Sequence, residues 1–131
     1  MKTLIVEDDF SCRLLLQKIL AGYGESHIAI NGLEAVHAFE VALVENEPYD
    51  LICMDIMMPD MDGNSALKEI REVEEQHGIQ VGDGVKVMMT SALNDMRSVS
   101  SSYRAFCDGY MVKPIDRTQL IMELRTMGLI E

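Results

Sequence analysis

Short apolar runs alternate with amphipathic stretches along the whole chain. The apolar runs span residues 3–6, 27–30, 51–54, 85–89 and 109–112, and their length is typical of strands. The third run is continuously apolar, which indicates a strand buried on both faces. The pattern therefore predicts a sheet built from these runs.

Apolar residues at helical spacing occupy the intervals between the predicted strands. In the first interval we expect a buried stripe formed by Cys12, Leu15, Leu16, Ile19 and Leu20. Asn31 can cap a second helix that runs to about residue 44, with Glu34 completing a capping box. Further helices are expected around 67–73, over 94–107 and over 116–127.

Strands that alternate with helices predict an α/β fold, a doubly wound parallel sheet with helices on both faces. In such open sheets, ligands bind outside the carboxyl ends of the strands. The 131 residues suffice for one such domain. We expect a single domain over residues 1–131, with no effector domain after the last helix.

Polar residues of related chemistry follow four of the five predicted strands. Asp8 and Asp9 follow the first strand, Asp55 the third, Thr90 the fourth and Lys113 the fifth. Because the carboxyl ends of parallel strands meet at one edge, three carboxylates, a hydroxyl and an ammonium group should converge there.

Converging carboxylates repel one another, and a hard divalent cation relieves that repulsion. Oxygen ligands without His or Cys favour Mg²⁺, with Mn²⁺ as the alternative. A carboxylate can attack phosphorus to form an aspartyl phosphate, and Asp55 is the candidate because it stands alone at a central strand end. Asp8 and Asp9 are the candidate metal ligands, and Thr90 and Lys113 are suitable donors to a phosphoryl group.

Composition and charge argue against several classes of protein. The net charge of −11 disfavours binding to nucleic acid or to an anionic membrane surface. No apolar stretch reaches the ~18 residues of a membrane span, and the N-terminus lacks a signal-peptide pattern, so we expect a cytoplasmic protein. We also expect it to be a monomer. The three cysteines are too widely spaced for a zinc pattern or a disulfide framework.

Five motifs together resemble the receiver domain of two-component response regulators. In chain order they read LIVEDD, NGLEA, DLICMDIMMPDMDG, MMTSA and GYMVKP, and they extend over essentially the whole chain. The resemblance implies a flavodoxin-like fold with strand order 2-1-3-4-5. It also implies a phosphorylation-activated signalling switch, similar to single-domain chemotaxis regulators, that catalyses only its own phosphorylation and dephosphorylation.

The same resemblance implies a role for each residue of the phosphorylation site. Asp55 would accept a phosphoryl group from a histidine kinase or a histidine phosphotransfer protein. Asp8 and Asp9 would bind Mg²⁺ together with Asp55 and the backbone carbonyl of Met57.

Further residues would sense the phosphoryl group. Thr90 would contact it, Lys113 would pair with it, and Tyr110 would be the aromatic residue that changes rotamer. The bond between Lys113 and Pro114 would be cis. A downstream protein would then bind the face formed by the fourth helix, the fifth strand and the fifth helix.

Two other functions are weighed against this one. A Mg²⁺-dependent aspartyl-phosphate phosphatase of the haloacid dehalogenase type also uses Asp, Thr and Lys. Its nucleophile, however, follows the first strand in an Asp-x-Asp-x-Thr/Val arrangement, which the stretch 8–12 does not fit. A non-phosphorylated interaction domain usually arises by loss of the acidic pair, the acceptor or the lysine, and all of these are present.

The outer face of the first helix is the predicted docking surface for a helical phosphodonor. At ~100° per residue, Phe10 and Leu14 point away from the expected buried stripe and form an apolar line beside Asp9, which Lys18 flanks. The long connection 74–84 carries no assigned role.

Overall fold

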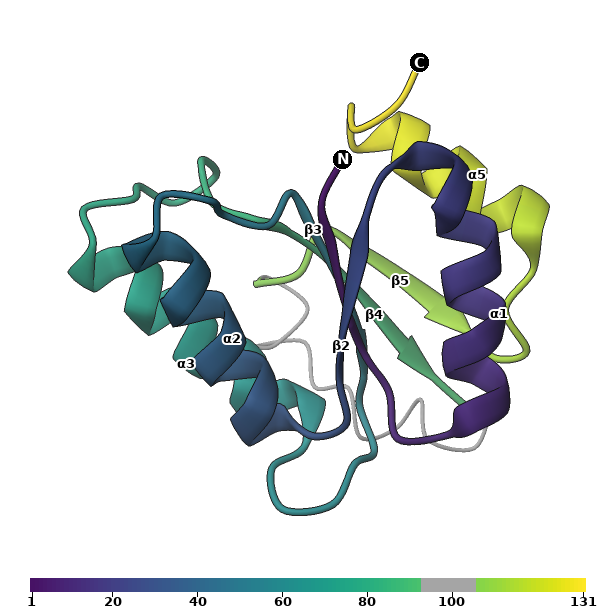
Figure 1. Ribbon diagram of the computed structural model, residues 1–131, viewed down its shortest axis with the longest axis horizontal. Helices are drawn as coiled ribbons and strands as arrows, with labels where there is room; N and C mark the ends of the chain where they lie inside the picture. The colour runs from purple at the N-terminus through teal and green to yellow at the C-terminus, as the bar shows by residue number, and fades with distance from the viewer. Residues whose placement is uncertain (93–105) are drawn as a thin grey trace.

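A five-stranded parallel sheet lies at the centre of the computed structural model, which describes residues 1–92 and 106–131 (Figure 1). The strands follow the spatial order β2-β1-β3-β4-β5, as expected. Their bounds are β1 Thr3–Val6, β2 Ser26–Ala29, β3 Leu51–Asp55, β4 Lys86–Ser91 and β5 Gly109–Val112. All neighbouring pairs are parallel, so the carboxyl ends of all five strands lie at one edge.

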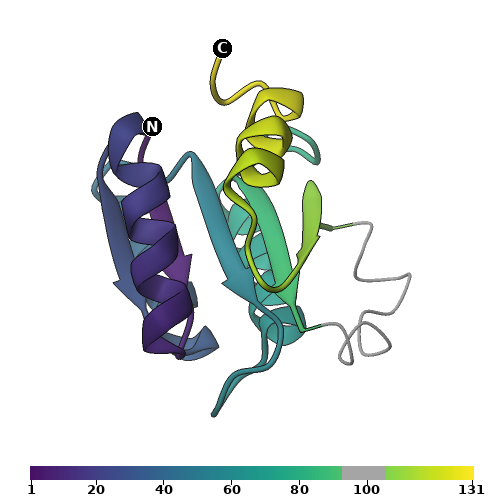
Figure 2. The ribbon, with the colours of Figure 1, turned by 90° about the vertical axis from the view of Figure 1, so that its right-hand side faces the viewer.

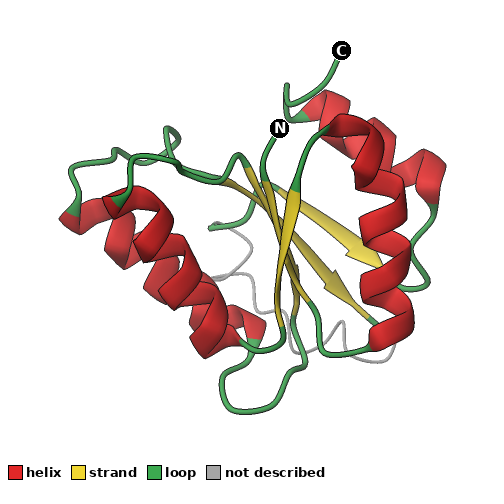
Figure 3. Cartoon of the chain, in the orientation of Figure 1, coloured by secondary structure: helices red, strands yellow, loops and turns green. Residues whose placement is uncertain are grey.

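Helices cover both faces of this sheet, which gives three layers (Figure 3). One layer holds α1 and α5 and the other holds α2 and α3, and Figure 2 shows α1 and α5 side by side in front of the strands. The helices are α1 Phe10–Leu20, α2 Gly32–Val44, α3 Gly63–Gln76 and α5 Arg117–Thr126, with a 3₁₀ turn over Ala21–Tyr23. The helix expected over 94–107 lies outside the described residues, apart from its last two positions.

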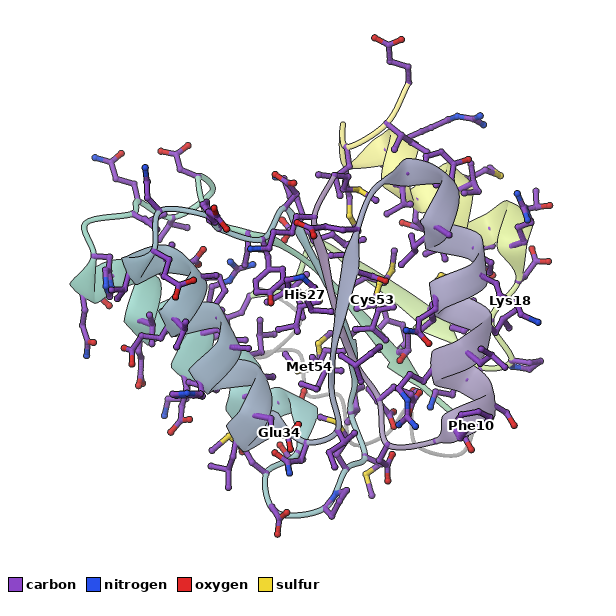
Figure 4. All side chains as sticks on the ribbon, in the orientation of Figure 1. Phe10, Lys18, His27, Glu34, Cys53 and Met54 are labelled. Atoms are coloured by element: carbon purple, nitrogen blue, oxygen red, sulfur yellow. The ribbon has the colours of Figure 1, made fainter. Side chains whose placement is uncertain are left out.

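Alternate residues of the strands supply two separate cores. In β3, Cys53 packs with residues of α1 and α5, whereas Met54 packs with residues of α2 and α3. Figure 4 shows both side chains between the layers. Every residue of β3 is buried, which explains its continuously apolar sequence up to Asp55.

Each described α-helix is preceded by an N-cap residue. The side-chain oxygen of this residue accepts a hydrogen bond from the backbone N–H three residues later. The capping residues are Asp9, Asn31, Asp62 and Asp116. At α2 the expected cap is confirmed, since Asn31 Oδ1 accepts from the Glu34 N–H at 2.8 Å. The Glu34 carboxylate accepts from the N–H of Ile30 rather than from that of Asn31.

The structure corrects several details of the sequence-based expectation. Leu15 was expected in the buried stripe but is 40% exposed, because the residues of α1 that pack on the sheet and α5 form a narrower stripe. Strand β4 continues through Thr90 and Ser91, two residues further than expected. The helical pattern over 94–107 predicts an inward side chain at Phe106, but this side chain is 45% exposed. The expected cis bond between Lys113 and Pro114 is confirmed.

The register of the sheet determines which residues share the carboxyl edge. Asp55, the last residue of β3, pairs with Thr90 of β4. Gly63 begins α3 close to this edge, and a Cβ atom there would lie 2.3 Å from the Asp55 carbonyl oxygen. No helix within the described ranges is long and apolar enough to span a membrane.

Candidate functional site

Three carboxylates converge at the carboxyl edge of the sheet: those of Glu7, Asp8 and Asp55. Each contributes an oxygen atom, and these oxygens all lie within 4.8 Å of one another. Glu7 and Asp8 directly follow β1, and Asp55 ends the neighbouring strand β3. Glu7 is 1% exposed and Asp55 is 5% exposed, whereas Asp8 faces solvent.

Asp9 does not join this group. Its Oδ2 atom accepts a hydrogen bond from the backbone N–H of Cys12 at 3.0 Å, so its side chain caps α1. The pair that the structure brings to Asp55 is therefore Glu7 and Asp8, one residue earlier than the sequence-based pair. A capping signal was present, because Asp9 stands directly before the first helical residue and Asp is a preferred N-cap.

Lys113 supplies the positive charge next to these carboxylates. Its Nζ atom lies 2.5 Å from Glu7 Oε1 and 3.3 Å from Asp55 Oδ2. The Glu7 Oε1 atom is buried and, apart from this ion pair, receives no well-directed hydrogen bond from the described residues. The ammonium of Lys113 thus lies between the two buried carboxylates.

The shared positive charge does not neutralise both buried acids. Burial is the largest single influence on Glu7 and by itself would raise its pKa. Its hydrogen bonds, above all the one to the Lys113 ammonium, together outweigh burial and lower that pKa. Burial, together with the neighbouring Glu7 carboxyl, raises the pKa of Asp55 to about 7. For Lys113, the loss of hydration on burial is outweighed by Glu7 and Asp55, so its pKa is raised. Lys113 therefore stays charged while Asp55 titrates near neutrality.

The thiol of Cys12 also borders this cluster. Burial, followed by hydrogen bonding to the Glu7 carboxylate, raises the pKa of Cys12 to about 12. The thiol therefore stays protonated at neutral pH.

Thr90 lies on β4, the strand next to Asp55, and Tyr110 lies on β5, the strand beyond it. Thr90 is 2% exposed, and its carbonyl oxygen accepts a hydrogen bond from the N–H of Ile56 at 3.0 Å. Tyr110 is half-buried, and its hydroxyl lies 2.6 Å from Ser91 Oγ. Sequence reasoning did not single out Ser91 for this contact.

The remaining expected residues lie on the surface around the site. Met57 follows Asp55 by two positions, and its side chain is 53% exposed. Phe10 and Leu14 on α1 are 66% and 38% exposed, as their helical positions predicted. Figure 4 shows Phe10 at the start of α1 and Lys18 further along, on the side away from the sheet.

The donor set fits a hard divalent cation. Carboxylate oxygens are the ligands that Mg²⁺ prefers, and the three carboxylates lie close enough together to share one ion. One buried oxygen of Glu7, Oε1, has the Lys113 ammonium beside it but no directed hydrogen bond from the described residues. Chemically, the site can place a cation, an ammonium group and a carboxylate nucleophile around one phosphoryl group.

Without divalent cations, we expect the protein to lose stability as the pH rises from about 5 to about 8. In that range the folded protein must release from Asp55 a proton that the unfolded chain has already lost, which lowers the free energy of unfolding. The lowered pKa of Glu7 acts only below about 4.5 and does not overlap with this range.

Asp55→Asn removes this titration. At about pH 8 its free energy of unfolding should exceed that of the wild type by at least about 1 kcal/mol, a lower bound smaller than the effect of a shift of one pKa unit. Urea unfolding in EDTA across the pH series measures both effects. A pH dependence that Asp55→Asn leaves unchanged would contradict the assignment of this titration to Asp55.

Comparisons with known proteins agree with this geometry. Over 122 residues the chain is 32% identical to the chemotaxis protein CheY of Bacillus subtilis, covering 92% of this chain and 91% of that protein. It is 37% identical over 133 residues to the hybrid signal transduction histidine kinase G of Dictyostelium discoideum, covering 99% of this chain but only 4% of that protein. The chain thus spans nearly the full length of one relative and a small part of the other.

A solved structure shows the same fold with ligands in place. The receiver domain of the histidine kinase CKI1 from Arabidopsis thaliana, complexed with Mg²⁺ and BeF₃⁻, superposes with a TM-score of 0.77 at 27% identity, covering 97% of this chain and 89% of that one. The family model of the response regulator receiver domain matches residues 3–125. The chain therefore belongs to the response regulator receiver domain family, the phosphorylation switches of two-component signalling systems.

Proposed function

We propose that Asp55 accepts a phosphoryl group from a phosphohistidine and that the resulting aspartyl phosphate is the signal. The observation that carries this proposal is the position of Asp55 at the end of β3, with Lys113 Nζ 3.3 Å from one of its oxygens and two further carboxylates beside it. The phosphodonor would be a histidine kinase or a histidine phosphotransfer protein.

Transfer requires the ionised form of Asp55. A carboxylate oxygen of Asp55 forms the new bond to phosphorus, the bond between phosphorus and the donor imidazole nitrogen breaks, and its electron pair stays on that nitrogen. Lys113 holds positive charge where the phosphoryl oxygens arrive, and Thr90 offers a hydroxyl on the neighbouring strand. Positioning and charge neutralisation are the main sources of catalysis in this chemistry.

Mg²⁺ would be held by Glu7, Asp8 and Asp55, with Mn²⁺ as an alternative ion. When bound, the ion supplies positive charge that favours the ionised carboxylates and neutralises the phosphoryl oxygens. The Met57 backbone carbonyl, proposed from the family resemblance, would complete the protein ligands. Asp9, which the family resemblance offered as a ligand, has a competing role as the cap of α1.

Phosphorylation would be read through Thr90 and Tyr110. Thr90 would move toward the phosphoryl group, and the Tyr110 ring would take a different rotamer in response. The proposed output face comprises β5, α5 and the helix expected over 94–107, and a downstream protein would bind it. Output would therefore be a protein contact, with no catalysis beyond the domain's own phosphorylation and dephosphorylation.

The phosphodonor would dock on α1. Phe10 and Leu14 present an apolar surface one helical turn apart, and the exposed Leu15 extends it. The Arg13 guanidinium lies 5.6 Å from the centre of the Phe10 ring and supports its position beside the site. Lys18, further along the helix, could pair with an acidic residue of the donor.

The setting of the domain is also a proposal. A surface with a net charge of −11 supports function without nucleic acid or membrane contact, in the cytoplasm and as a monomer.

Incubation with acetyl phosphate and Mg²⁺ should add one phosphoryl group to the wild type and none to Asp55→Asn, because the amide cannot act as the nucleophile. Intact-protein mass spectrometry measures the added mass, and peptide mapping after borohydride reduction locates it. Stoichiometric labelling of Asp55→Asn at another residue would refute the assignment.

Asp8→Asn should weaken Mg²⁺ binding by at least about tenfold, because it removes one charge from the ligand group. Asp9→Asn is the matched control, since Asn caps a helix as well as Asp and should leave Mg²⁺ binding nearly unchanged. Isothermal titration calorimetry with MgCl₂ gives both affinities. An equal loss of Mg²⁺ affinity in the two variants would show that Asp9 is also a ligand.

Leu14→Asp should slow phosphotransfer from the cognate histidine protein by about tenfold, while labelling by acetyl phosphate stays at the wild-type rate. Leu33→Asp is the matched control, because Leu33 is an exposed leucine on α2, in the opposite layer. Radiolabel transfer assays with both donors give the rates. Losses of the same size with both donors would exclude α1 as the docking surface.

A further inference from the structure

The contact between Ser91 and Tyr110 joins the last residue of β4 to the neighbouring strand. Ser91 is fully buried, and its Oγ atom lies 2.6 Å from the Tyr110 hydroxyl. The register pairs Tyr110 with Met89, two residues before Ser91, so both side chains stand on the same face of the sheet.

Ser91 Oγ has two partners within hydrogen-bond distance. One is the Tyr110 hydroxyl at 2.6 Å, where either oxygen can be the donor. The other is the carbonyl oxygen of Ala92 at 3.2 Å, to which the serine hydroxyl can donate. These contacts connect the Tyr110 hydroxyl through Ser91 to the backbone at Ala92.

The Ala92 carbonyl oxygen offers the buried serine hydroxyl an acceptor other than Tyr110. The contact with Tyr110 is thus not needed to bury Ser91. What it constrains is the orientation of the tyrosine ring, which must point along the sheet toward the carboxyl edge to reach Ser91.

The backbone of Thr90 and Ser91 is hydrogen-bonded to residues of the proposed phosphorylation site on both neighbouring strands. The N–H of Ile56, the residue after Asp55, donates to the Thr90 carbonyl at 3.0 Å. The N–H of Lys113 donates to the Ser91 carbonyl at 2.7 Å. A shift of Asp55, Thr90 or Lys113 therefore reaches Ser91 through one peptide unit or one hydrogen bond.

We propose that Ser91 is a positioning residue that ties the rotamer of Tyr110 to the backbone beside the acceptor site. The inference rests on the proposed switching role of Thr90 and Tyr110 and names the contact that transmits it. In the unphosphorylated domain Ser91 holds the ring toward the carboxyl edge, and a change at Thr90 alters that hydrogen bond because the two residues share a peptide unit.

The test compares Ser91→Ala, Tyr110→Phe and the double variant, each of which removes the same hydrogen bond. Three-bond couplings on a ring-labelled residue 110 give its χ1 rotamer populations by NMR. We expect each single variant to shift the rotamer ratio by about two- to tenfold, the effect of one ordinary hydrogen bond. The double variant should show no further shift, and Ser11→Ala, on the exposed side of α1, should match the wild type.

The same measurement after addition of beryllofluoride and Mg²⁺ separates this inference from the proposed function. A wild-type ring that does not respond would refute the switching role of Tyr110. A ring that responds equally in the wild type and in Ser91→Ala would overturn the role of Ser91, as would additive effects in the double variant. If Ser91→Ala does not fold, unchanged populations in Tyr110→Phe would overturn it.

Discussion

The ion pair between Lys113 and Glu7 is the interaction on which the rest of the site depends. Two carboxyl groups, those of Glu7 and Asp55, are almost completely buried at the end of adjacent strands, and burial of unpaired charge is costly. One ammonium group between them stabilises the ionised form of Glu7 but leaves Asp55 with a pKa of about 7. The site is therefore short of positive charge, which a divalent cation would supply.

Neighbouring aspartates have separate tasks in this architecture. Asp8 faces the cluster of carboxylates, whereas Asp9 turns away and satisfies an N–H at the start of α1. Asp62 and Asp116 similarly cap the helices that follow β3 and β5. These caps begin the helices close to the carboxyl edge, and the domain's acidic residues thus serve the fold as well as the chemistry.

Strand β4 connects Asp55 to β5, which belongs to the proposed output face. It lies between β3, which carries Asp55, and β5, which carries Tyr110. Its last two residues are hydrogen-bonded through their carbonyls to the residue after Asp55 and to Lys113. These hydrogen bonds form a contiguous connection from Asp55 across β4 to the outer strand β5.

The sequence alone determined the α/β class, the bounds of β1 and β5, and the convergence of Asp55, Thr90 and Lys113, because apolar periodicity reports burial and parallel strands end at one edge. Motif resemblance added the strand order. Only the tertiary structure decided that Glu7, in place of Asp9, joins Asp8 and Asp55, and that Leu15 is exposed. The direction of adjacent side chains after β1 depends on the cap of α1 and on Lys113, which is distant in sequence. The width of a buried helical stripe likewise depends on the elements that pack against it.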